Sequence, residues 1–140
     1  MSYEDEDPPF VEPDRELDEL AHAVIGAAIE VHKRLGAGLD EAFYENAMCI
    51  ELRHRGIPFL KQVVVGLQYR GESIGERRVD LIVGGRLVVE LKAVEALAPI
   101  YSAQLRTYLK ITRNKLGLLI NFNVGMLKDG LKRIINSSSF

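Results

Sequence analysis

The stretch that decides the fold is RRVDLIVGGRLVVELK, residues 77–92. Aliphatic runs on both sides of Gly84-Gly85 predict two β-strands joined by a tight hairpin, because both glycines accept the positive φ of such a turn. A two-residue turn would mix charged and apolar residues on both faces. A three-residue loop of Gly84, Gly85 and Arg86 instead sets Val83 opposite Leu87, and we predict that register. One face is then wholly apolar, with Val79, Leu81, Val83, Leu87, Val89 and Leu91.

The opposite face of this hairpin carries the charged residues. It holds Arg78, Asp80, Ile82, Val88, Glu90 and Lys92, and it places Asp80 directly across from Glu90. Two carboxylates about 5 Å apart repel each other by on the order of a few kcal/mol at an effective dielectric near 20, so a positive charge must offset them. Ion pairs with Arg78 and Lys92 are one solution, and a divalent cation bound by both carboxylates is the other.

The second solution implies a hydrolytic site. Oxygen ligands without cysteine or histidine suit hard ions such as Mg²⁺ or Mn²⁺. A water activated by the cation could attack a phosphodiester, and Lys92, two residues beyond Glu90 on the same face, could stabilise the developing negative charge. The spacing of these residues leaves both solutions open.

Helical patterns come before this hairpin. Apolar residues at three-and-four spacing predict a helix from Leu17 to Leu35, ended by Gly36 and Gly38. A second helix is expected from about Asp40 to Gly56. We expect its buried side to hold Phe43, Ala47, Ile50 and Met48, and Glu41 and Glu45 to share another face.

Strands and one further helix surround the hairpin. Residues 59–70 are rich in valine and aromatic residues and are predicted to hold two strands, with a turn at 70–75, and residues 115–122 are predicted to form a buried strand. Residues 99–111 are predicted to form a helix that begins at Pro99. Residues 124–136 are compatible with a helix by their apolar spacing or with a turn at Asp129-Gly130 before a short edge strand, and we favour the strand. The order of elements indicates an α/β (α+β) fold with a mixed central sheet flanked by helices.

Charge divides the chain into an arm and a domain. Residues 1–19 hold nine acidic side chains and one basic, whereas the remainder holds 17 basic and 11 acidic. We expect residues 1–16 to form an acidic, disordered arm, residues 17–136 a single domain and residues 137–140 a frayed end. A basic domain attracts polyanions such as nucleic acid. The single cysteine, Cys49, and the lack of a long apolar run favour a cytoplasmic protein without a membrane segment.

Several motifs resemble one known family. Residues 38–44, GLDEAFY, are similar to the motif of the GxxExxY family, and Asp80 with Glu90-Leu91-Lys92 resembles the signature of the PD-(D/E)XK nuclease superfamily that contains it. The likeness also takes in INF at 120–122 and LKDGLKRI at 127–134. Val79 stands where the superfamily name has proline, and Tyr101-Ser102 stands where the family pattern has His-Glu.

The resemblance implies a restriction-endonuclease-like core with a metal site at the hairpin. Asp80 and Glu90 would be metal ligands, with the Leu91 carbonyl as a third, and Lys92 would be the catalytic lysine. Glu41 would complete the acidic cluster. The last two site residues, Gln104 and Tyr108, would position substrate or Lys92.

Two functions are compatible with these features. The first is a Mg²⁺-dependent or Mn²⁺-dependent nuclease that hydrolyses phosphodiester bonds in nucleic acid, with DNA favoured and a homodimer as one way to span a duplex. The second is an inactive nuclease-fold module that binds nucleic acid or a protein partner. Metal binding that depends on Asp80 would separate the two.

Overall fold

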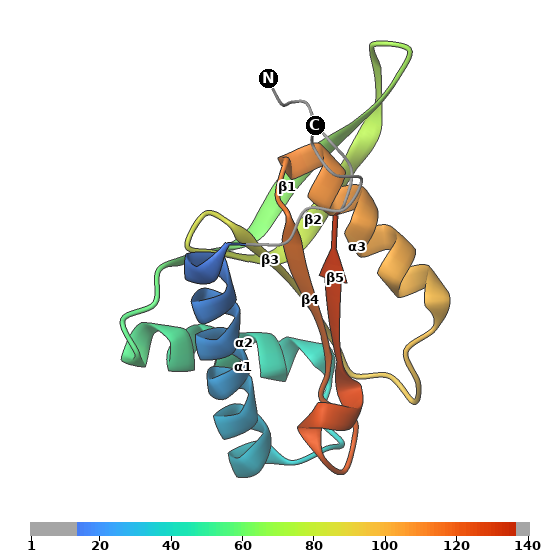
Figure 1. Cartoon of the computed structure of the whole chain (residues 1–140). Coiled ribbons are helices and arrows are strands. Elements are labelled where there is room, and N and C mark those ends of the chain that lie inside the picture. Colours follow the sequence, from blue (N-terminus) through green and yellow to red (C-terminus); the bar gives the residue numbers. More distant parts are fainter. Residues whose placement is uncertain (1–13, 137–140) are drawn as a thin grey trace.

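The computed structural model describes residues 14–136, and its centre is a mixed sheet of five strands (Figure 1). The strands lie in the order β1-β2-β3-β4-β5, and only β3 and β4 run parallel. Their bounds are Phe59–Tyr69 for β1, Glu72–Val83 for β2, Leu87–Lys92 for β3, Leu116–Asn121 for β4 and Leu131–Ile135 for β5. The expected mixed sheet and its short edge strand β5 are confirmed. The prediction of two strands within residues 59–70 is wrong, because this stretch forms the single strand β1 and the next strand already begins at Glu72.

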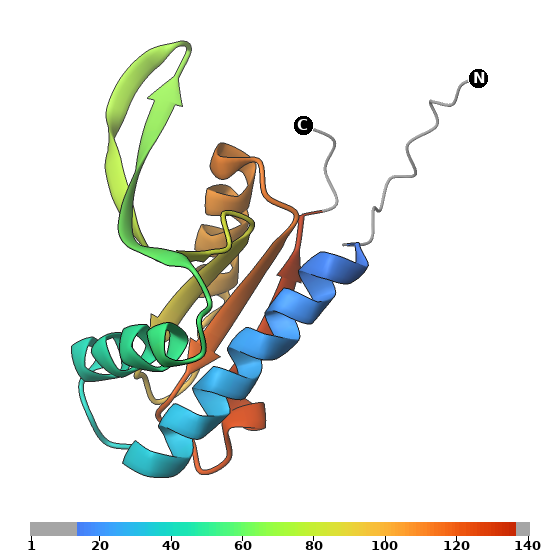
Figure 2. The same ribbon diagram turned by 90° about the vertical axis from the view of Figure 1, so that its left-hand side faces the viewer.

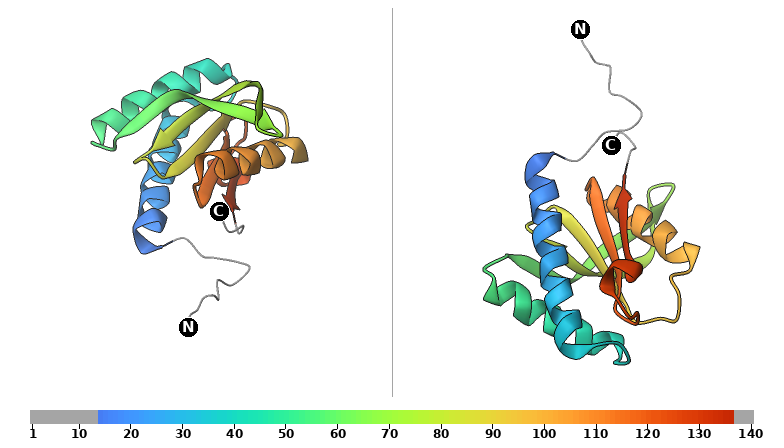
Figure 3. Two further views of the ribbon diagram at one scale, coloured as in Figure 1. Left: turned by 90° about the horizontal axis from the view of Figure 1, so that it is seen from above. Right: turned by 60° about the horizontal axis from the view of Figure 1, so that its bottom comes forward.

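Helices cover both faces of the sheet (Figure 3). Helices α1 (Arg15–Leu35) and α2 (Glu41–His54) lie on one face, and α3 (Pro99–Thr112) lies on the other. A short 3₁₀ helix, η1 (Leu127–Gly130), leads into β5. Because successive strand residues point to opposite faces, β3 and β4 contribute to both layers and are almost wholly buried. None of the helices in residues 14–136 is long and apolar enough to cross a bilayer.

The predicted register of the β2–β3 hairpin is confirmed. Val83 pairs with Leu87 and Leu81 with Val89. Gly84 and Gly85 have φ values of 60° and 72°, which is the left-handed region that the loop requires. Most of the predicted apolar face packs against α1 and α2. Val79 is the exception, because it packs in the cluster on the α3 side, so the prediction that it shares a face with Leu81 is wrong.

Helix α1 begins slightly earlier than the sequence pattern predicts. Asp14 caps it by accepting a hydrogen bond from the N–H of Leu17, and it also binds the Arg86 guanidinium through both of its oxygens. Residues 14–16, which we assigned to the acidic arm, thus form the cap and first turn of the helix. The rest of that arm, residues 1–13, and the predicted frayed end at 137–140 lie outside the described residues.

Helix α2 turns a different side to the core than predicted. Tyr44, Met48, Cys49 and Leu52 are its buried residues. Phe43 is 57% exposed and Ile50 is 60% exposed, so the prediction that they are buried is wrong. Ile50 lines a cavity of about 790 Å³ between α1 and α2 instead. The side of α2 that is buried decides which of its acidic residues lie near the β2–β3 hairpin.

Candidate active site

The sheet forks where Asp80 and Glu90 lie. The β2–β3 ladder ends at the pair Leu81–Val89. Beyond that pair, β2 continues with β1, and β3 continues beside β4 to Lys92. The fork leaves backbone N–H groups without ladder partners, and such groups must be satisfied in another way.

The two carboxylates satisfy these N–H groups. The N–H of Asp80 donates to Glu90 Oε2 at 2.8 Å, and the N–H of Leu91 donates to Asp80 Oδ2 at 2.8 Å. Both acidic residues are only 8% exposed. The structure therefore brings the predicted pair together and fixes each carboxylate to the backbone of the opposite strand.

This location disfavours two negative charges. Burial is the main cause that raises the pKa of Asp80 to about 6, with Glu45 and Glu41 adding to it. Burial also raises the pKa of Glu90 to about 8, and the charge of Asp80 is the second cause. The Leu91 N–H and Lys92 act in the opposite direction on Asp80. At neutral pH the pair therefore favours a proton or a cation over two free charges.

Lys92 and Glu41 lie beside this pair. The Lys92 ammonium sits 4.6 Å from the centre of the Tyr101 ring, a distance suited to a cation–π contact. Burial raises the pKa of Glu41 while the charge of Lys92 lowers it, which places the two groups within electrostatic reach. Neither Arg78 nor Lys92 forms a salt bridge with any residue between 14 and 136. The ion-pair ladder considered from the sequence is therefore not formed.

The tyrosine of the GLDEAFY motif, Tyr44, has a structural role. Its hydroxyl donates to the Gly36 carbonyl at 2.6 Å and accepts from the N–H of Leu39 at 3.2 Å. Its ring stacks on Phe122 with centroids 4.6 Å apart. These contacts fix the turn between α1 and α2, and so they hold the first residue of α2, Glu41, near the hairpin.

Gln62 is a site residue that the sequence reasoning missed, and Glu45 was named only as a neighbour of Glu41. The Gln62 amide donates to both oxygens of Glu45, at 2.9 and 3.0 Å, and lies 3.5 Å from Asp80 Oδ1. Its φ is 52°, which is uncommon for a residue other than glycine, and the β1–β2 ladder skips the pair it would make with Asp80. No sequence signal marks a left-handed glutamine within a strand.

Helix α3 contributes Tyr108 and Gln104 from the other face of the sheet. Tyr108 is buried, and its pKa is raised by burial and then by the charge of Glu90, which places it beside the carboxylate pair. Gln104 and Tyr108 line a cavity of about 160 Å³ together with Arg77, Leu67 and Thr107. The cavity lies between α3 and the β1–β2 hairpin, and neither Asp80 nor Glu90 lines it.

The donors at the fork match a hard cation. No three His, Cys, Asp or Glu side chains in residues 14–136 form a metal cluster by themselves. Mg²⁺ needs no such cluster, because it commonly uses one or two carboxylates and keeps several waters. Asp80 and Glu90 supply two carboxylates, and their raised pKa values indicate that positive charge is favoured there. The residues present therefore fit Mg²⁺ or Mn²⁺.

Comparisons with known proteins agree with this architecture. The model of the PD-(D/E)XK nuclease superfamily matches residues 18–134. The crystal structure of SSO0001 superposes with a TM-score of 0.53 at 19% identity, over 89% of this chain and 59% of that one. The chain thus spans about three fifths of the length of that protein, and the likeness concerns the fold alone. No curated protein sequence matches the chain.

Proposed function

Because this chain belongs to the PD-(D/E)XK nuclease superfamily, we propose that it hydrolyses phosphodiester bonds in nucleic acid, with DNA as the favoured substrate. The observation that carries the proposal is the pair of buried carboxylates, Asp80 and Glu90, anchored across the fork in the sheet. Within the superfamily, the GLDEAFY motif assigns the chain to the GxxExxY family.

Each site residue has a distinct role in this proposal. Asp80 and Glu90, with the Leu91 carbonyl, would hold Mg²⁺ or Mn²⁺, which supplies Lewis-acid activation of water and neutralises phosphate charge. Lys92 stabilises the negative charge that develops on the phosphate oxygens. Glu41 completes the acidic cluster.

Neighbouring residues position these groups. The Tyr101 ring fixes the Lys92 ammonium, and the Gln62 amide holds Glu45 apart from Asp80, where two carboxylates would otherwise repel. Gln104 and Tyr108 position the substrate strand from α3. These residues reach the site from β1 and α3, so both faces of the sheet contribute to it.

Cleavage assays with matched variants test the proposal. We expect Mg²⁺-dependent cleavage of a panel of single-stranded, double-stranded and branched DNA and RNA, and its loss in Asp80→Asn, Glu90→Gln and Lys92→Ala. The control variants Asp129→Asn and Lys132→Ala remove the same charges at exposed positions and should cleave normally. Circular dichroism verifies that every variant is folded.

Two outcomes would contradict the proposal. Site variants that cleave as fast as the wild type would show that other residues perform the reaction. A wild-type protein that binds nucleic acid in a salt-sensitive manner, without turnover and without calorimetric Mg²⁺ binding, would identify the chain as a non-catalytic module.

A further inference from the structure

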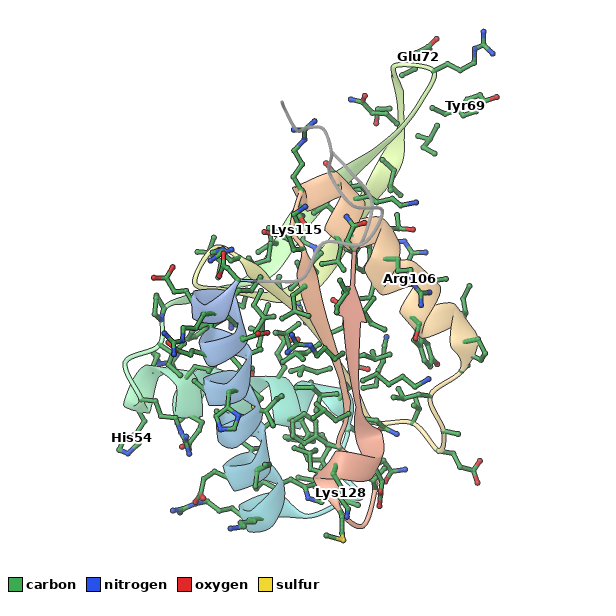
Figure 4. All side chains as sticks on the ribbon, in the orientation of Figure 1. His54, Tyr69, Glu72, Arg106, Lys115 and Lys128 are labelled. Carbon is green, nitrogen blue, oxygen red and sulfur yellow. The ribbon has the colours of Figure 1, made fainter. Side chains whose placement is uncertain are left out.

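The outward side of α3 carries a basic stripe, defined here as Arg106, Lys110 and Arg113. The spacing of four residues places Arg106 and Lys110 on one side of the helix, Arg113 follows as its C-cap, and all three are exposed. Figure 4 shows Arg106 pointing away from the body of the protein. The sequence contains no acidic residue between Glu95 and Asp129, so α3 itself supplies no counter-charge to the basic stripe.

Most arginines of the other two long helices are paired. Arg15, Arg34 and Arg55, the C-cap of α2, each pair with a glutamate four residues away, whereas Arg53 of α2 forms no salt bridge with a described residue. None of the basic stripe residues forms a salt bridge with a described residue. Lys110 and Arg113 can interact with the helix dipole at the C-terminus, but Arg106 lies mid-helix and cannot. Unpaired cations in a row are typical of a surface that binds a polyanion.

The β1–β2 hairpin extends beyond the body beside α3 (Figure 2). Its turn lies at Arg70-Gly71, nine residues from Asp80 and so about 30 Å away along an extended strand. Tyr69 is 65% exposed and Ile74 is 67% exposed near this turn, and Figure 4 shows Tyr69 and Glu72 at the tip. At the hairpin base, Arg77 shares a cavity with Gln104 and Thr107 of α3.

We propose that the basic stripe and the β1–β2 hairpin together bind a B-form DNA duplex. The basic stripe contacts phosphates, and the two-stranded ribbon enters the major groove, which is about 12 Å wide and admits such a ribbon. The major groove of A-form RNA is deep and narrow, and a single strand has no groove at all, so the ribbon fits duplex DNA. This inference rests on the proposed function and specifies the substrate of the same site.

Salt dependence tests the basic stripe. Duplex DNA binding is measured by fluorescence anisotropy over a range of salt concentrations in Asp80→Ala and in EDTA, conditions under which the proposed function predicts no cleavage. Adding Arg106→Ala and Lys110→Ala should reduce the slope of log K against log salt by roughly 1.8, since each phosphate contact contributes about 0.9. The control pair Lys33→Ala and Arg53→Ala removes two exposed charges on the α1–α2 side and should leave the slope unchanged. Equal slopes in both pairs would overturn the proposal.

Substrate shape tests the hairpin. Tyr69→Ala with Arg70→Asn keeps a residue that tolerates the left-handed φ of 50° at position 70. We expect about ten-fold weaker binding to duplex DNA and unchanged binding to single-stranded DNA. Equal affinity of the unmodified hairpin for duplex DNA and duplex RNA would overturn the groove assignment. So would a shift of oligomeric state in the tip variant, which would identify the hairpin as a contact between copies of the chain.

The binding and cleavage assays fail independently. A changed salt slope in a protein that never cleaves would refute the nuclease proposal and keep the DNA-binding surface. Metal-dependent cleavage that is lost in Asp80→Asn, together with an unchanged slope, would keep the nuclease and refute the surface.

Discussion

Glu90→Gln should stabilise the metal-free protein while it abolishes cleavage. Glu90 is 8% exposed, and burial followed by the charge of Asp80 raises its pKa to about 8. Glutamine has nearly the same shape, and its amide oxygen can still accept the N–H of Asp80 that Glu90 Oε2 accepts at 2.8 Å. The substitution therefore removes the buried charge and keeps the hydrogen bond.

The sign of the effect follows from the direction of the pKa shifts. Both acids have folded pKa values, about 6 and about 8, above their ordinary values of 3.8 and 4.5. Between about pH 4 and pH 8 the folded state therefore holds protons that the unfolded state has released, and the free energy of unfolding falls as the pH rises. At about 1.4 kcal/mol per pKa unit, the loss from Glu90 is on the order of 3 to 5 kcal/mol at pH 8.

Urea denaturation in EDTA at pH 5 and pH 8 measures this effect. We expect the wild type to lose stability between the two pH values and Glu90→Gln to lose much less, so that the variant is the more stable protein at pH 8. The exposed control Asp129→Asn should follow the wild type. A wild-type stability that is constant or rises from pH 5 to pH 8 would refute the reasoning about the carboxylate pair.

Three further predictions concern the cation, Gln62 and Tyr44. Mg²⁺ should raise the Tm of the wild type more at pH 8 than at pH 5, because protons compete for the same carboxylates, and EDTA should reverse the shift; equal shifts in Asp80→Asn would contradict this. Gln62→Gly should be about 1 kcal/mol more stable than Gln62→Ala in urea denaturation, because glycine adopts the φ of 52° without strain, yet both should lose cleavage equally because both lack the amide. Tyr44→Phe removes the hydroxyl bonds to Gly36 and Leu39 and should lower stability by about 1 kcal/mol and cleavage by more than stability alone explains; cleavage at the wild-type rate would show that this turn does not position Glu41.

The register of the β2–β3 hairpin was predictable because only one register leaves one face of the hairpin apolar. A shift of one residue moves every side chain to the opposite face, so the rule that one face be apolar fixed the three-residue loop. The same rule placed Asp80 across from Glu90, and the structure anchors each to the other's strand. The roles of these residues as metal ligands, and that of Lys92, stay predictions.

The buried side of α2 was not predictable from periodicity. Apolar residues occur around the whole helix, so a face with Phe43 and Ile50 looks as apolar as the face with Tyr44 and Met48. The choice depends on contacts distant in sequence. The Tyr44 hydroxyl is satisfied by the Gly36 carbonyl, and its ring stacks on Phe122, which no local pattern indicates. An aromatic residue with a polar group is buried where a partner exists.

The fork in the sheet links the site to the projecting hairpin. The pairing of β2 with β3 ends at Leu81, so the part of β2 that precedes Leu81 pairs only with β1. The β1–β2 hairpin therefore extends from the level of the sheet at which the two carboxylates lie. At the same level Gln62 does not pair with Asp80 in the β1–β2 ladder, and its side-chain amide instead binds Glu45. Restoring a regular ladder through Asp80 would pair these backbone groups, remove the anchors of both carboxylates and end the separation of the strands. One irregularity therefore accounts for the buried carboxylates, the left-handed conformation of Gln62 and the β1–β2 hairpin that extends beyond the body.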